Sequence, residues 1–208
     1  MKKFLMSVSM LAAMCVTMSS CLKNDSDNYV APVDPSVEAP ALQAFIDSTG
    51  YNMVTQSDSL YLYVSNGTNF ELKGYKMPYL YYEIVNPGNL TQGSTDTSDA
   101  AIGGSVGGNT TIYNTYTDST LIASVTYKGT LLNGTEFGKS DEPVLFAIPN
   151  MIYAWQALVG KVGKGGEIRI LTPSLYGYSN SAKTGIPANS PLYFDVKVVG
   201  FVKNSYGK

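Results

Sequence analysis

Apolar residues at every second position, over 121–127 and 192–198, constrain the fold of this chain more than any other feature. A period of two residues places successive side chains on opposite faces of a β-strand. We therefore expect two strands whose apolar faces point into one core. The residues that form these faces are Leu121, Ala123, Val125, Tyr127, Leu192, Phe194, Val196 and Val198.

More strands and one short helix are predicted around this pair. Residues 60–64 and 79–84 alternate in the same way, and a third run, 167–171, follows two consecutive glycines. Residues 150–159 are expected to form a short helix that carries the single tryptophan, Trp155. Sixteen tyrosines, twenty glycines and ten prolines favour strands and turns over long helices. The order of these segments predicts an α+β fold, a curved antiparallel sheet wrapped around a short helix.

The N-terminus has the composition of a bacterial lipoprotein signal peptide. Lys2 and Lys3 precede the apolar run 4–16, and Met18-Ser19-Ser20 stands directly before Cys21. The apolar run is shorter than the roughly 20 residues that a membrane-spanning helix requires. We expect residues 1–20 to be removed, Cys21 to carry a lipid, and the protein to be anchored in the bacterial cell envelope at the outer membrane. Exposure at the cell surface is left open.

A tether and a small extension are predicted between the signal peptide and the main domain. Residues 21–40 are rich in Asn, Asp, Ser and Pro, and their prolines, up to Pro40, are expected to prevent a regular helix. The extension, residues 41–76, begins with apolar side chains at helical spacing that stop at Gly50. It continues into a hairpin whose turn is predicted at Asn66-Gly67.

The lack of histidine and of a second cysteine in the processed chain excludes several kinds of chemistry. The chain has no histidine, and after removal of the signal peptide Cys21 is its only cysteine. Ser-His-Asp and Cys-His catalysis and the usual zinc sites therefore cannot form, and we expect neither a metal nor a cofactor. The net charge is −2 and Arg169 is the only arginine, so nucleic acid is not expected as a partner.

Several motifs in the second half of the chain resemble the FKBP-type peptidyl-prolyl isomerases, in particular their Bacteroidetes lipoprotein subgroup. The resemblance covers most of residues 80–202 and implies a domain at 77–203, interrupted by an unmatched Gly/Ser/Thr/Asn-rich insertion at about 89–120. It implies the same α+β fold that the periodicity predicts. The motifs are Tyr127-Lys128-Gly129-Thr130-Leu131, Asn133-Gly134-Thr135-Glu136-Phe137, Met151-Ile152-Tyr153-Ala154-Trp155, Pro173-Ser174-Leu175-Tyr176-Gly177-Tyr178, Ile186-Pro187-Ala188-Asn189-Ser190-Pro191-Leu192 and Phe194-Asp195-Val196.

The resemblance also implies a binding site for proline-containing polypeptides. Trp155 matches the floor of the family's pocket, Ile152 the residue whose backbone N–H binds a substrate carbonyl, and Tyr178 the tyrosine whose hydroxyl donates to the ligand. Each aromatic residue taken alone is more typical of ordinary core packing, whereas the ordered set with Ile152 and Tyr178 favours a pocket. The implied catalytic residues are Tyr127, Phe137, Ile152, Trp155 and Tyr178, and the implied substrate-binding residues are Phe146, Met151, Ile186 and Phe194.

Some positions differ from the family pattern. Gly138 stands where the family has an Asp that hydrogen-bonds within the pocket, Ser179 stands where Gly is normal, and Ala188 replaces a proline. Residues 139–143 are expected to form a shortened loop whose charges, Asp141 and Glu142, are solvated rather than substitutes for the missing carboxylate.

Three hypotheses for the function follow. The first is a lipid-anchored isomerase of X-Pro bonds that assists the folding of envelope proteins. The second, motivated by Gly138, is a catalytically weak or silent relative that binds proline-containing segments or partner proteins. The third is a structural or glycan-binding lipoprotein that uses exposed tyrosines, namely Tyr61, Tyr63, Tyr79 and Tyr81.

Overall fold

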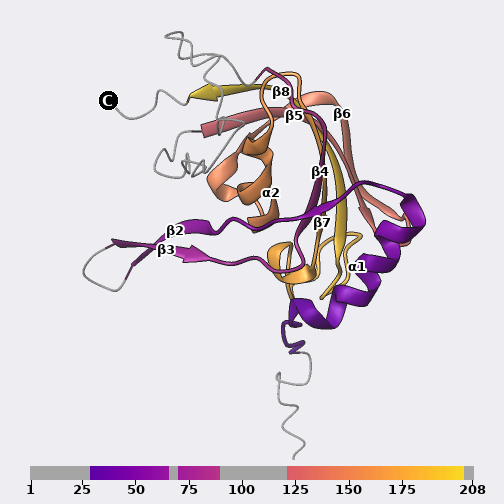
Figure 1. Cartoon of the computed structure of the whole chain (residues 1–208). Helices are drawn as coiled ribbons and strands as arrows, with labels where there is room; N and C mark the ends of the chain where they lie inside the picture. Colours follow the sequence, from indigo (N-terminus) through magenta and orange to yellow (C-terminus); the bar gives the residue numbers. More distant parts are fainter. Residues whose placement is uncertain (1–28, 66–69, 90–120, 204–208) are drawn as a thin grey trace, which may run out of the picture.

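A six-stranded antiparallel sheet wraps around one short helix, α2 (Tyr153–Leu158) (Figure 1). The computed structural model describes residues 29–65, 70–89 and 121–203. The strand order in the sheet is β1-β4-β7-β8-β5-β6, so segments distant in the sequence pair directly. The predicted α+β fold is therefore confirmed. The strands are β1 (Val54–Thr55), β4 (Tyr81–Asn86), β5 (Leu121–Leu131), β6 (Glu136–Ala147), β7 (Glu167–Thr172) and β8 (Leu192–Lys203).

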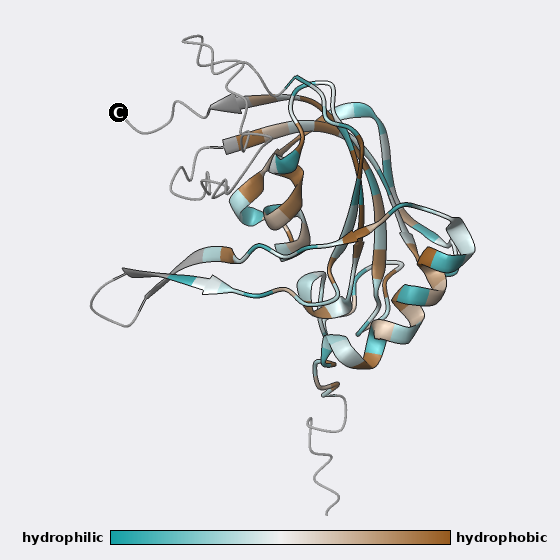
Figure 2. Cartoon of the chain, viewed as in Figure 1, coloured by the Kyte–Doolittle hydropathy of each residue, from teal (hydrophilic) through white to brown (hydrophobic). Residues whose placement is uncertain are grey.

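The main hydrophobic core lies between α2 and the concave face of the sheet (Figure 2). On β8 the four alternating apolar residues predicted from the sequence are all buried, and on β5 Ala123 and Val125 are fully buried. Burying a Val, Leu, Ile or Phe side chain contributes about 1.5–3 kcal/mol. The period-two alternation is thus explained by this single buried face.

A second cluster covers the opposite face of the sheet, where α1 (Pro35–Thr49) packs with Leu42 against Leu171 and Tyr193. The alternation predicted for residues 79–84 is visible here. Leu80 lies in the main core, whereas Tyr79 and Tyr81 pack against the α1 cluster. A binding surface made of four exposed tyrosines therefore does not form, because two of the four are partly buried.

Helix α1 starts earlier than the sequence predicted, and the expectation that prolines prevent a helix across residues 35–40 is wrong. Asp34 caps the helix by accepting a hydrogen bond from the Ser36 backbone N–H at 2.9 Å. Pro35 occupies the first helical position, where a missing N–H costs nothing. Pro40 removes one hydrogen bond from the second turn, a loss offset by burial of the helix against the sheet. The helix ends at Gly50 as predicted, with φ of 67°.

A separate two-stranded hairpin, β2 (Leu60–Ser65) and β3 (Phe70–Tyr75), projects from the body of the molecule (Figure 1). Tyr61 and Tyr75 are exposed on it. The Tyr61 ring lies over Gly74, where a Cβ would approach it to 2.9 Å. The predicted turn at Asn66-Gly67 lies outside the described residues.

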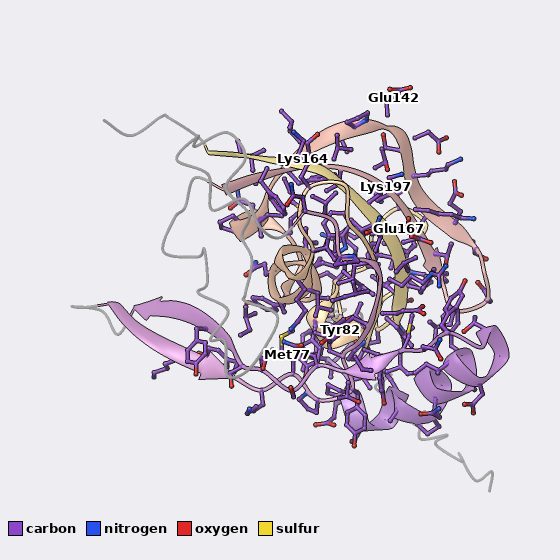
Figure 3. The ribbon with its side chains drawn as sticks, turned by 45° about the horizontal axis from the view of Figure 1, so that its top comes forward. Met77, Tyr82, Glu142, Lys164, Glu167 and Lys197 are labelled. Carbon is purple, nitrogen blue, oxygen red and sulfur yellow. The ribbon has the colours of Figure 1, made fainter. Side chains whose placement is uncertain are left out.

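The loop expected at residues 139–143 is instead part of β6, so that expectation is wrong. Val125 pairs with Val144 while Tyr127 pairs with Ser140, which makes residues 141–143 a bulge within the strand. The carboxylates in the bulge are exposed, as predicted: Asp141 pairs with Lys139 at 2.8 Å, and Glu142 lies on the outer surface (Figure 3).

The predicted signal peptide, Cys21 and most of the predicted insertion lie outside the described ranges. Across the ranges that are described, no helix combines the length and the apolar character needed to cross a bilayer.

Within the described residues there are three short 3-10 turns: η3 (Ile148–Asn150), η4 (Val159–Lys161) and η5 (Ser174–Tyr176). The first leads into α2, the second follows it, and the third begins the long connection from β7 to β8. That connection and α2 form two sides of the candidate site.

Candidate functional site

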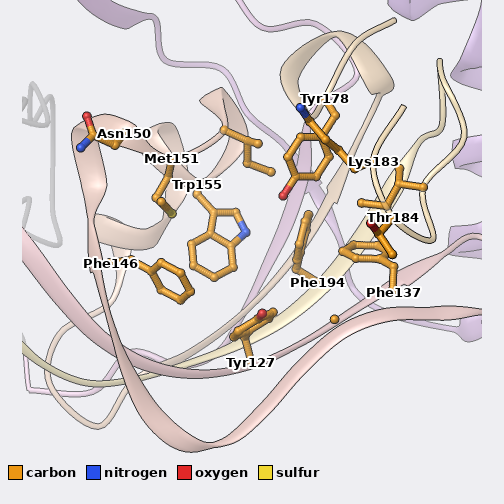
Figure 4. A pocket seen from close by; sticks show the side chains of 13 residues that line it. Tyr127, Phe137, Phe146, Asn150, Met151, Trp155, Tyr178, Lys183, Thr184 and Phe194 are labelled. Atoms are coloured by element: carbon orange, nitrogen blue, oxygen red, sulfur yellow. The ribbon is translucent and has the colours of Figure 1, made fainter. Parts of the chain in front are cut away.

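A cavity of about 550 Å³ lies between α2, the concave face of the sheet and the β7–β8 connection (Figure 4). All nine residues that the resemblance assigned to catalysis or substrate contact line it. They come from three strands, the start of α2 and the β7–β8 connection: Tyr127, Phe137, Phe146, Met151, Ile152, Trp155, Tyr178, Ile186 and Phe194.

Trp155 forms the floor of this cavity and is held by the rings around it. Only 4% of its surface is exposed, and it projects from α2 toward the sheet. The rings of Tyr127, Phe146 and Phe194 meet the indole edge-on, with centroids 5.7, 5.5 and 5.5 Å away. Edge-to-face contacts at this spacing are the favoured geometry for aromatic pairs. The floor is therefore a rigid part of the hydrophobic core.

Phe137 forms a second wall, and its position depends on Gly129. Gly129 of β5 pairs with Gly138 on one side and with Phe194 on the other. A Cβ at Gly129 would lie 2.6 Å from the Phe137 ring, so only glycine allows the ring to pack there. The Phe137 ring in turn contacts the edge of Phe194, with centroids 5.5 Å apart.

Ile152 contributes a free backbone donor beside the floor. It is the N-cap of α2, and its carbonyl accepts from the backbone N–H groups of Trp155 at 3.0 Å and Gln156 at 3.1 Å. The Gln156 side chain donates to the Met151 carbonyl at 2.6 Å and holds this backbone in place. No hydrogen bond among the described residues uses the Ile152 N–H. An orphan N–H at a helix start is available to a ligand.

Tyr178 contributes a side-chain donor from the opposite wall. Its hydroxyl points into the cavity toward Trp155 and Phe194 (Figure 4). Burial, and to a lesser degree the nearby Tyr127, raise the pKa of Tyr178 above its usual value of 10. The hydroxyl therefore stays protonated, and able to donate, throughout the neutral and mildly alkaline range. The indole Nε1 of Trp155 is a third donor, which is buried and has no partner in the described part of the chain.

The cavity lacks the carboxylate that the family pattern would place at position 138. A Cβ built on Gly138 would lie 3.4 Å from the Tyr127 hydroxyl oxygen, so a longer side chain there would point at that hydroxyl. Lys183 is the one charged side chain among the lining residues. Its Nζ lies 6.0 Å from the centre of the Tyr178 ring.

The sequence did not single out Asn150, Lys183, Thr184 or Gly129 as parts of the site. Lys183 reaches the rim because residues 183–186 form a tight turn, in which Lys183 and Ile186 exchange backbone hydrogen bonds of 2.8 and 2.9 Å. Gly185 permits this turn with φ of 76°. A Lys-Thr-Gly sequence is a turn signal that could have indicated the lysine's position.

The lining residues offer hydrogen-bond donors and aromatic surface rather than a nucleophile. Within the described residues, no three His, Cys, Asp or Glu side chains are grouped so that they could hold a metal ion. Binding an apolar ring on the indole floor, with donors fixing neighbouring carbonyls, is the chemistry that this geometry supports.

The chain is similar to known proteins over the part that builds this site. The model of the FKBP-type peptidyl-prolyl cis-trans isomerase family matches residues 115–199. The FKBP-type isomerase FkpA of Buchnera aphidicola (Schizaphis graminum strain) is 38% identical over 84 residues, covering 39% of this chain and 33% of the relative. FkpA of Escherichia coli K12 is 38% identical over 78 residues, covering 36% of this chain and 29% of the relative. FK506-binding protein 3 of Eremothecium gossypii is 44% identical over 77 residues, covering 35% of this chain and 18% of the relative.

The crystal structure of Escherichia coli FkpA is similar with a TM-score of 0.49 and 22% identity, covering 82% of this chain and 62% of that one. The chain spans a third or less of the length of the curated relatives named above. The segment that the family model matches, residues 115–199, contains the aromatic floor and walls described here. Over residues 115–199 this chain therefore resembles the FKBP-type peptidyl-prolyl cis-trans isomerases.

Proposed function

We propose that the aromatic cavity binds the proline ring of an X-Pro segment and accelerates its cis–trans isomerisation. The observation that carries this proposal is the Trp155 floor, enclosed edge-on by three rings yet open to a cavity of about 550 Å³. In this proposal the substrates are proline-containing polypeptides, and the match of residues 115–199 to the FKBP-type isomerase family supports an isomerase.

The physics of the reaction suits a site without a nucleophile. Rotation about an X-Pro bond breaks amide resonance and has a barrier of roughly 20 kcal/mol. The twisted transition state is less polar than the planar amide, so a water-poor aromatic pocket favours it. In this proposal the Ile152 N–H and the Tyr178 hydroxyl hold the carbonyls that flank the bond. Each 1.36 kcal/mol gained in this way is about a tenfold increase in rate.

A second candidate function is a silent binding module, and Gly138 is the observation that favours it. With glycine at this position, no carboxylate lines the cavity to accept a hydrogen bond from Tyr127. The pocket would then grip proline-containing segments or partner proteins without accelerating their isomerisation.

A paired kinetic and binding experiment separates the two candidates. The full chain, purified in detergent micelles, is tested in a proline-peptide isomerisation assay, while the fluorescence of the single tryptophan, Trp155, reports binding. Acceleration proportional to protein concentration supports the isomerase. Quenching or enhancement of the fluorescence without acceleration supports the silent module. If neither acceleration nor a fluorescence change is seen, both candidates are rejected.

A Gly138→Asp variant sharpens this test. The new carboxylate would stand beside the Tyr127 hydroxyl, and one hydrogen bond to a charged group is worth about 1.5–3 kcal/mol. We expect kcat/KM to rise by about tenfold to a hundredfold if the missing carboxylate limits the native protein. An unchanged kcat/KM would show that the native site does not need it.

We further propose that the protein is lipid-anchored through Cys21 at the outer membrane and assists the folding of envelope proteins. The signal-peptide pattern before Cys21 supports this location. A Cys21→Ser variant, expressed in a bacterium that lipidates secreted proteins, is expected to move from the membrane fraction to the soluble envelope fraction. Cys15→Ser is the matched control and should stay with the membrane. Retention of the Cys21→Ser variant in the membrane would contradict the proposed anchor.

A further inference from the structure

The β7–β8 connection supplies Tyr178, Lys183 and Ile186 to the pocket without the support of a sheet. Two of its non-glycine residues have left-handed backbone angles, with φ of 53° at Ser179 and 55° at Asn189. Such conformations are unfavourable for residues other than glycine and persist only where the surroundings hold them. Ser179 is the residue directly after Tyr178, so whatever holds Ser179 also orients the tyrosine.

The N-terminal segment holds this connection from outside. The Asn180 side-chain amide donates to the Val30 carbonyl, and the Asn189 side-chain amide donates to the Ala31 carbonyl, each at 2.8 Å. The Glu38 carboxylate, on the first turns of α1, accepts from the Ser174 backbone N–H at 2.8 Å. Three points of the connection are therefore tied to residues 30–38.

Two further bonds inside the connection join these points into a ring. The Ser179 N–H donates to the Ser174 carbonyl at 2.7 Å, and the Asn189 N–H donates to the Ser179 carbonyl at 2.8 Å. The path runs from Glu38 through Ser174, Ser179 and Asn189 to Ala31, and the backbone from 31 to 38 closes it. Tyr178 lies next to one member of the ring.

Glu38 is buried to an unusual degree for a carboxylate, with 8% of its surface exposed. A buried carboxylate is costly unless hydrogen bonds compensate it. Its position near the start of α1 also places it at the favourable end of the helix dipole. A glutamate that only stabilised the helix through its dipole could lie on the solvent-exposed face of α1.

We propose that residues 30–38 are a positioning element of the pocket, with Glu38 and Asn189 as the positioning residues that set the orientation of Tyr178. For its catalytic readout this inference rests on the proposed isomerase activity. It assigns to the N-terminal segment a role beyond linking the domain to an anchor.

The test uses the full chain with Glu38→Ala, the conservative Glu38→Gln, and Asn189→Asp, which removes the amide donor but keeps a side chain that tolerates a left-handed backbone. Gln43→Ala is the matched control. Gln43 makes an equally short side-chain bond on the same helix, 2.8 Å to Asp47, and that bond does not involve the connection. Hydrogen exchange of the Ser179 and Asn189 amides is measured in each variant, because both amides are bonded within the ring.

We expect exchange at these two amides to become at least about tenfold faster in Glu38→Ala and Asn189→Asp, and to stay near the native rate in Glu38→Gln and Gln43→Ala. Unchanged exchange in Glu38→Ala would overturn the inference. This readout needs no catalysis, so it stands even where the isomerase assay fails and the proposed function falls.

A kinetic cycle with Tyr178→Phe then tests the link to the site. If Glu38 acts through Tyr178, Glu38→Ala lowers kcat/KM by about five- to tenfold in the native background and by less than twofold in the Tyr178→Phe background. Equal losses in both backgrounds would show a general structural effect and overturn the positioning role.

Discussion

The pocket has two walls that are built in different ways. The wall formed by the sheet and α2 places its rings through strand pairing and edge-on aromatic contacts, and its floor, Trp155, is part of the main core. The wall formed by the β7–β8 connection places Tyr178 and Lys183 through a few hydrogen bonds and two left-handed residues. The apolar surface that we propose as the binding site of a proline ring is thus rigid, whereas the side-chain donor and the charge lie on a wall that smaller changes can move.

The largest effect is expected at the floor of the rigid wall. Trp155→Ala removes a buried indole that three rings contact, and we expect the free energy of unfolding to fall by about 3–5 kcal/mol. Urea denaturation measures this loss, and NMR titration with a proline peptide should show no remaining binding. Trp155→Phe is the control and should retain most of the stability. Full peptide affinity in a folded Trp155→Ala protein would contradict the assignment of the floor.

Alkaline pH is expected to weaken the second wall next. Burial, with a smaller contribution from Asp34, raises the pKa of Tyr176 to about 12, against about 10 in the unfolded chain. As the pH rises, the Tyr176 hydroxyl therefore loses its proton at a lower pH in the unfolded state than in the folded state. The contribution of Tyr176 to the free energy of unfolding should be constant below pH 10. It should fall between pH 10 and 12 by at most about 2–3 kcal/mol. Chemical denaturation at a series of pH values measures the fall, and Tyr176→Phe should make it shallower. An identical fall in the variant would remove Tyr176 as its cause.

A smaller loss is expected where the rigid wall depends on one glycine. Gly129→Ala places a Cβ 2.6 Å from the Phe137 ring, so the ring must move, at a cost of about 1–3 kcal/mol. Gly200→Ala is the matched strand control, since a Cβ there meets nothing within 4 Å. Thermal unfolding compares the two variants, and peptide affinity should fall only in the first. Equal stability of both variants would show that Phe137 does not need the space above Gly129.

The smallest effect is expected from the charge on the second wall. Lys183 is exposed at the rim, and an exposed charge pair changes affinity by only about two- to fivefold. Peptides with Glu before the proline should therefore be favoured over peptides with Lys, and Lys183→Glu should reverse the order. Added salt should reduce the preference in both proteins. Lys197→Glu, on a solvent-exposed residue of β8, is the control (Figure 3). If the preference for Glu over Lys is unchanged in Lys183→Glu, a group other than Lys183 must cause it.

The two walls also differ in how far the sequence predicted them. Alternation of period two correctly located the strands that bear Tyr127 and Phe194, because one buried face dictates the pattern. The contacts that hold the second wall were not predicted, since Glu38 and Ser174 are 136 residues apart in the sequence. Local rules also failed at Pro40, where tertiary burial outweighs the loss of one helical hydrogen bond. The bulge at 141–143 depends on the register between β5 and β6, which a strand's own sequence does not specify.

NMR exchange spectroscopy on a short X-Pro peptide is the most direct test of the central claim, that the aromatic cavity lowers the barrier to X-Pro rotation. The full chain in detergent micelles should raise the cis-to-trans exchange rate in proportion to its concentration, and Trp155→Ala should abolish the increase. An exchange rate equal to that of the free peptide, at protein concentrations where peptide resonances shift on binding, would contradict it.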